Sequence, residues 1–176
     1  MKEYPEVDNG IARIKLVYEW ATGYCISFII ADDKEVQEYI KASILSIDTE
    51  KIPDERIINY NFCENLKNAR ENIKKFQNLC QEKGNLIIAT GIGEYAEYLE
   101  KNGNIPNTKT FYQRMFSLPR DSFYLKNNVR LILLVNEAEM KMFRSEVADD
   151  FTSYARMNVD VNDILRENNI QNIDGR

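Results

Sequence analysis

The chain contains no histidine among its 176 residues. Without an imidazole, Ser-His-Asp and Cys-His catalysis, histidine zinc sites and imidazole acid–base chemistry are excluded. Cysteine is scarce as well, and the three thiols, Cys25, Cys63 and Cys80, are widely spaced. This odd number predicts neither a disulfide framework nor a metal knuckle, and it favours reduced thiols in the cytoplasm. We therefore expect no catalytic triad, no metal and no cofactor.

Long apolar runs are also missing. The longest, LILLV at 131–135, is strand-sized, whereas a membrane span needs about 20 residues. The opening MKEYPEVDNG has neither the basic start nor the apolar core of a signal peptide. We expect a cytoplasmic protein without membrane contact.

Basic residues are not in excess, with 23 Lys and Arg against 28 Asp and Glu. The formal charge of −5 argues against nucleic acid as a direct partner, because phosphate binding needs clustered cations. Hydrophobic residues make up 44% of the chain, which is too apolar for a disordered protein.

Five short apolar segments alternate with helical patterns along the chain. The predicted strands are 24–31, 56–62, 85–90, 130–135 and 157–161, and the first is preceded by a predicted helix at 11–21. This alternation predicts an α/β fold with a five-stranded, mostly parallel sheet and helices on both faces, a three-layer sandwich. We expect one domain over residues 1–161, followed by a short helix and tail over 162–176.

The middle of the chain carries two helical patterns. Apolar residues at three- and four-residue spacing predict a helix over 64–83. Residues 102–110 are predicted to form a loop, and 111–127 a helix with Ser117 as an N-cap and Pro119 near a restart. The stretch from Tyr95 to Tyr124 is also rich in aromatic residues. Core packing explains part of this density, and an interface explains the rest equally well.

The candidate ligand residues lie at predicted strand ends, because open parallel sheets bind ligands at the carboxyl ends of their strands. They are Asp32, Asp33, Thr90, Gly91, Gly93 and Asn136. The first turn, ADDKEV, has no glycine and two carboxylates, so both its shape and its charge disfavour a phosphate-binding loop.

Several interpretations of these residues stay open. The acidic pair is expected to cap the following helix, with Asp32 as the N-cap, or to ligate Mg²⁺. The glycine pair fits a turn that needs positive φ, or a small anion nest. Asn136 is a predicted N-cap of the helix at 137–145.

Three parts of the sequence carry a family resemblance. They are NLIIATGIGEY with the later MFSLPRDSFYLKNNVRLILLVNEAEM, the segment VADDFTSYAR, and the opening helix with the strand and acidic turn after it. Together they resemble the P-loop-NTPase-like N-terminal domain, lacking a Walker A loop, of bacterial STAND- and TPR-type signalling and defence proteins. Arg120-Asp121 and strand 130–135 are the most specific part, while Ser117, Pro119, Thr152 and Tyr154 depart from the family pattern.

The resemblance implies an NTPase-like scaffold without a working nucleotide site. We expect a non-catalytic interaction or adaptor domain of a bacterial signalling or anti-phage defence assembly, bound to other proteins of the same operon. Candidate interaction residues are Arg120, Asp121, Tyr154 and Arg156. A structural ion pair is the alternative role for Arg120.

Parts of the sequence also fit two other functions. One is a small Mg-dependent nucleotide-binding or phosphotransfer enzyme that uses Asp32, Asp33 and Thr90. The other is a receiver-like regulatory domain, which ranks last because the third predicted strand ends in Ala89-Thr90 without the required aspartate.

Overall fold

The computed structural model describes residues 3–20, 23–46, 56–147 and 155–174, and its centre is a five-stranded sheet. The strands are β1 (Cys25–Ile30), β2 (Arg56–Asn61), β3 (Asn85–Thr90), β4 (Arg130–Val135) and β5 (Ala155–Asp160). They are ordered β2-β3-β4-β1-β5, and every neighbouring pair is parallel. The predicted α/β fold is confirmed, with a sheet that is wholly rather than mostly parallel.

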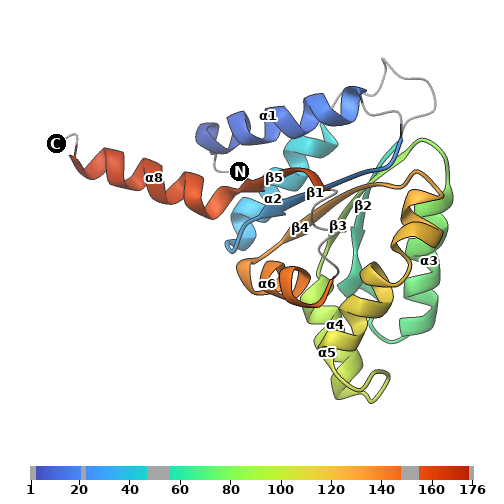
Figure 1. Ribbon diagram of the computed structural model, residues 1–176. Helices are drawn as coiled ribbons and strands as arrows, with labels where there is room; N and C mark the ends of the chain where they lie inside the picture. Colours follow the sequence, from blue (N-terminus) through green and yellow to red (C-terminus); the bar gives the residue numbers. More distant parts are fainter. Residues whose placement is uncertain (1–2, 21–22, 47–55, 148–154, 175–176) are drawn as a thin grey trace.

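Helices cover both faces of this sheet and make a three-layer sandwich (Figure 1). One face carries α1 (Pro5–Trp20) and α2 (Lys34–Leu45). The other carries α3 (Ala69–Gln81), α4 (Ile92–Lys101), α5 (Thr108–Tyr112) and α6 (Glu137–Glu146). The last helix, α8 (Val161–Asp174), packs on α1 and then extends beyond the sheet.

The sheet separates two hydrophobic cores. β1, β3 and β4 are buried along their whole length, which explains their continuous apolar sequences. Successive side chains point to opposite faces, so Ile26 and Phe28 join the core under α3–α6, while Cys25 and Ile29 join the core under α1 and α2.

The aromatic residues of the segment from α4 to β4 belong mainly to the core. Tyr95, Phe111, Tyr112, Phe116 and Tyr124 are all buried, and only Tyr98 and Phe123 are half-buried. Core packing, rather than an interface, therefore accounts for most of this aromatic density.

The segment between β3 and β4 differs most from the prediction. α5 begins at Thr108, inside the predicted loop, where the Asn107 side chain accepts a hydrogen bond from the Thr110 amide. Two π-helical segments, η2 (Gln113–Ser117) and η3 (Arg120–Leu125), replace the single predicted helix. Pro119 has no amide hydrogen to continue a helix. It occupies the N-cap position of η3, and the predicted N-cap at Ser117 is wrong.

Other helix boundaries shift by several residues. A 3-10 turn, η1 (Phe62–Asn65), is capped by Asn61 and delays α3 until Ala69, where Asn68 caps it. α1 begins at Pro5, before the predicted start. Among the helices that the structure describes, none combines the length and the apolar character needed to cross a membrane.

Candidate functional site

The topology places a switch point at the carboxyl ends of β1 and β4. These strands are neighbours, yet α2 follows β1 on one face and α6 follows β4 on the other. Ligands bind at such switch points in open α/β sheets. We call the residues that follow β1, β3 and β4, numbers 31–33, 91–93 and 136–139, the carboxyl edge. All the predicted strand-end residues lie there or at the last position of β3.

The two aspartates after β1 have different roles. Asp33 caps α2, because its Oδ1 accepts from the amides of Glu35 (2.7 Å) and Val36 (3.2 Å). The predicted cap at Asp32 is therefore wrong by one residue. Asp32 Oδ1 instead accepts a hydrogen bond from the Glu137 amide at the start of α6 (2.8 Å). The Asp32 amide donates to Asn162 Oδ1 (2.9 Å). Asp32 thus ties β1 to α6 and α8.

A buried glutamate joins the N-termini of α4 and α6. Asn136 caps α6 as predicted, and it forms a reciprocal capping box with Glu139 (2.8 and 2.7 Å). The other carboxylate oxygen of Glu139 accepts from the Gly93 amide in the first turn of α4 (2.6 Å). The pattern Asn-x-x-Glu was the signal that could have revealed the Asn136–Glu139 part of this contact.

The two glycines are needed for different reasons. Gly91 has φ +74°, which confirms the positive-φ turn, and a Cβ there would lie 2.6 Å from Asn61 Oδ1. Gly93 is needed for space, because a Cβ would lie 2.8 Å from Glu139 Cγ. The Gly93 amide, which an anion nest would use, already donates to Glu139.

The carboxyl edge is rich in negative charge. Burial raises the pKa of Glu139, and Glu94 and Glu97 raise it further, while the amides of Asn136 and Gly93 oppose the shift. Glu94 pairs with Lys34 at 3.3 Å, and both side chains are exposed. Among the described residues, a bound phosphate would therefore meet several carboxylates, with Lys34 as the nearby lysine.

The Cys63 thiol lies beside this edge. Its Sγ is 3.4 Å from the Gly91 carbonyl oxygen and 3.5 Å from Glu94 Oε2. Burial, followed by the charge of Glu94, raises the Cys63 pKa to about 11. The thiolate, which is the reactive form, is therefore scarce at neutral pH.

Alkylation of Cys63 by iodoacetamide is expected to be slow at pH 7 and to speed up about tenfold per pH unit until the pH approaches the thiol pKa. Glu94→Gln removes the carboxylate that disfavours the thiolate, so it should raise the rate at pH 8 about threefold or more. Mass spectrometry of timed samples measures the rate, and Cys63→Ser identifies the site. Equal rates in the wild type and Glu94→Gln would contradict this assignment.

Thr90 is brought to this end of the sheet but not into contact with the acidic pair. It is the last residue of β3, and β4 lies between β3 and β1. The backbones of β3 and β1 are therefore about 10 Å apart. Its buried hydroxyl has no hydrogen-bond partner among the described residues. Nor do the described residues include three Cys, Asp or Glu side chains grouped to hold a metal ion.

The predicted interaction residues lie elsewhere. Arg120 and Asp121 form a two-pronged ion pair (2.7 and 2.8 Å) in η3, which leads toward the amino end of β4. The hydrogen bond from Arg120 lowers the pKa of Asp121. Tyr154 lies outside the described residues. Arg156 belongs to β5, and the structure describes its backbone alone.

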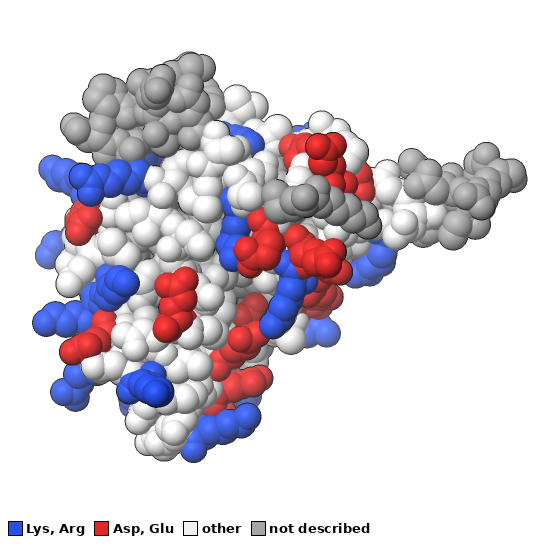
Figure 2. Space-filling view, turned by 180° about the vertical axis from the view of Figure 1, so that it is seen from behind, with Lys and Arg blue, Asp and Glu red and all other residues white. Residues whose placement is uncertain are grey.

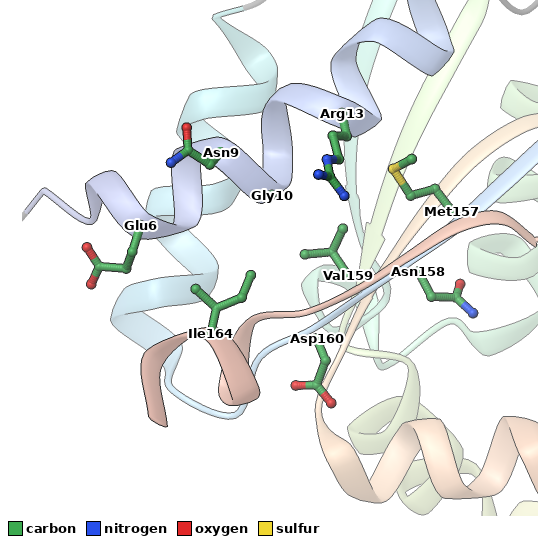
Figure 3. Close-up of a pocket in the computed structure, with 9 residues that line it drawn as sticks. All are labelled: Glu6, Asn9, Gly10, Arg13, Met157, Asn158, Val159, Asp160 and Ile164. Carbon is green, nitrogen blue, oxygen red and sulfur yellow. The ribbon is translucent and has the colours of Figure 1, made fainter. Parts of the chain in front are cut away.

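A pocket of about 810 Å³ lies between α1, β5 and α8. Figure 3 shows Arg13 pointing into the gap between α1 and β5, whereas Asp160 and Glu6 point away from it. Gly10 allows the close approach of α1 to β5, since a Cβ would lie 3.0 Å from Val159 Cγ1. The polar groups do not converge, so this pocket is a weaker candidate than the carboxyl edge.

The carboxyl edge is thus the place where the fold would hold a ligand, and its helix N-termini are engaged by side chains of the chain itself. Asp33 binds amides of α2, Glu139 binds one of α4, and Asp32 and Asn136 bind amides of α6. In comparisons with known proteins, the chain matches no family model, no curated protein and no solved structure.

Proposed function

We propose that this chain is a non-catalytic protein-interaction or adaptor domain, built on an α/β scaffold that does not bind nucleotide. The observation that carries the proposal is the engagement of three helix N-termini at the carboxyl edge by Asp33, Glu139 and Asn136. The function of such a domain lies in its surface rather than in a ligand site at the carboxyl edge.

Phosphate binding at a helix N-terminus uses free backbone amides and the positive end of the helix dipole. Here the amides of Glu35, Gly93 and Glu137 each donate to a carboxylate at 2.6–2.8 Å. A phosphate would have to displace these carboxylates and then remain near them. Because like charges at short distance repel strongly outside bulk water, nucleotide binding at this edge is disfavoured.

The family resemblance in the sequence supports the cellular part of the proposal. On that basis the domain, with its degenerate NTPase-like fold, belongs to a bacterial signalling or anti-phage defence assembly. Its partners are other proteins encoded in the same operon, and the exposed Asp121 with its partner Arg120 is one candidate contact.

The test is a calorimetric titration of the protein with Mg-ATP, Mg-GTP and Mg²⁺ alone. We expect no saturable heat, with dissociation constants weaker than about 1 mM. Tighter binding that is lost in Asp32→Asn or Asp33→Asn would instead favour the small Mg-dependent nucleotide-binding or phosphotransfer enzyme, because both aspartates are exposed at the switch point.

A further inference from the structure

A groove of about 780 Å³ runs between α3 and the segment from α4 to η2. Its rim carries four exposed cations, Lys67, Arg70, Lys74 and Arg114. Its floor is apolar and includes Ile73, Ile105 and Met115. We call this feature the basic groove. Figure 2 shows Lys and Arg side chains gathered along the side of the molecule where α3 lies.

The lining of the basic groove has a local excess of positive charge. It includes four cations and no Asp or Glu, on a chain whose formal charge is −5. In the part of the chain that the structure describes, none of these four cations forms an ion pair. Arg70 and Lys74 are one helical turn apart on α3, and Arg114 lies in η2, so cations come from both walls.

We infer that the basic groove binds an acidic amphipathic segment of a partner protein. A helix laid in such a groove places its apolar face on the half-buried Ile73 and Ile105 and its carboxylates against the rim. This inference rests on the proposed interaction function and names the chemistry of the partner.

Nucleic acid fits the basic groove less well than an acidic peptide. Single strands are held by aromatic rings on which bases stack, but Phe111, an aromatic ring of the lining, is only 3% exposed. The half-buried side chains of Ile73 and Ile105 provide no ring on which a base could stack, whereas they match leucine side chains.

The test uses two synthetic helical peptides of about 16 residues, each with leucines along one face and with either glutamates or lysines on the other. Fluorescence anisotropy measures their binding to the wild type and to R70E/K74E. The wild type should bind the glutamate peptide at least about tenfold more tightly than the lysine peptide, with weaker binding as salt rises. R70E/K74E should lose about tenfold for the glutamate peptide and gain affinity for the lysine peptide.

K126E/K141E is the matched control, because it makes the same change in net charge at exposed lysines outside the groove. It should bind the glutamate peptide like the wild type, and circular dichroism should show that both variants are folded. Equal loss in the control, or no binding by folded wild type, would overturn the inference. So would tighter binding of a single-stranded oligonucleotide than of the peptide. None of these results affects the nucleotide titration, which tests the proposed function separately.

Discussion

Replacing Glu139 by alanine is expected to lower the free energy of unfolding by about 2–4 kcal/mol, because it leaves two part-buried amides without their acceptors. The amides are those of Gly93 and Asn136, which donate to the two oxygens of this one carboxylate. Urea unfolding followed by circular dichroism measures the loss. Glu139→Gln, which keeps one acceptor oxygen, should lose less.

A double-mutant cycle that combines Glu139→Ala with Gly93→Ala measures the coupling between these two positions. In the wild type the new methyl group would lie 2.8 Å from Glu139 Cγ and 2.9 Å from its Oε1, so the substitution should be destabilising. In the Glu139→Ala background the clash is gone, and alanine in a helix is favoured over glycine by about 0.5–1 kcal/mol. We therefore expect a coupling of at least about 1 kcal/mol. Additive effects would show that Glu139 does not bridge α4 and α6.

Replacing Phe62 by alanine should cost about 3–5 kcal/mol. Its ring is fully buried and lies 4.9 Å from Phe76, 5.0 Å from Tyr60 and 5.5 Å from Tyr95, measured between ring centroids. The substitution removes the ring where η1, α3 and α4 meet. Since a domain is stable by only about 5–15 kcal/mol, much of the native stability should be lost.

Urea unfolding again provides the measurement for Phe62→Ala. Phe62→Leu, which keeps most of the buried volume, should lose about 1–1.5 kcal/mol. Leu118→Ala is the surface control, because Leu118 is 75% exposed, and it should stay within about 0.5 kcal/mol of the wild type. A loss below about 1 kcal/mol in Phe62→Ala would contradict the central position of this ring.

The sequence predicts the layers of this fold better than its connections. The bounds of β3 and β4 were predicted to the residue, because both strands are buried on two faces and read as continuous apolar runs. The N-cap at Asn136 is a local signal and was also found. The π-helical segments around Pro119 were missed, since their hydrogen-bond pattern follows packing rather than a residue motif.

The carboxyl edge shows why a site is harder to predict than a strand. The predicted residues do lie at the strand ends, but the sequence did not show that Glu139 reaches Gly93, which is 46 residues away. That contact depends on the distance between α4 and α6, which only the assembled sheet determines. Likewise, adjacent acids do not reveal which of Asp32 and Asp33 caps α2 and which bonds to α6.

The central claim is that side chains of the chain itself hold the amides at the carboxyl edge, where a nucleotide phosphate would otherwise bind. The most direct measurement is a titration of the ¹⁵N-labelled protein with Mg-ATP, in which NMR spectra report the chemical shift of each backbone amide. We expect the amide signals of Gly93, Glu137 and Glu35, which donate to Glu139, Asp32 and Asp33, to stay in place up to about 5 mM nucleotide. Saturable shifts confined to these signals would contradict the claim.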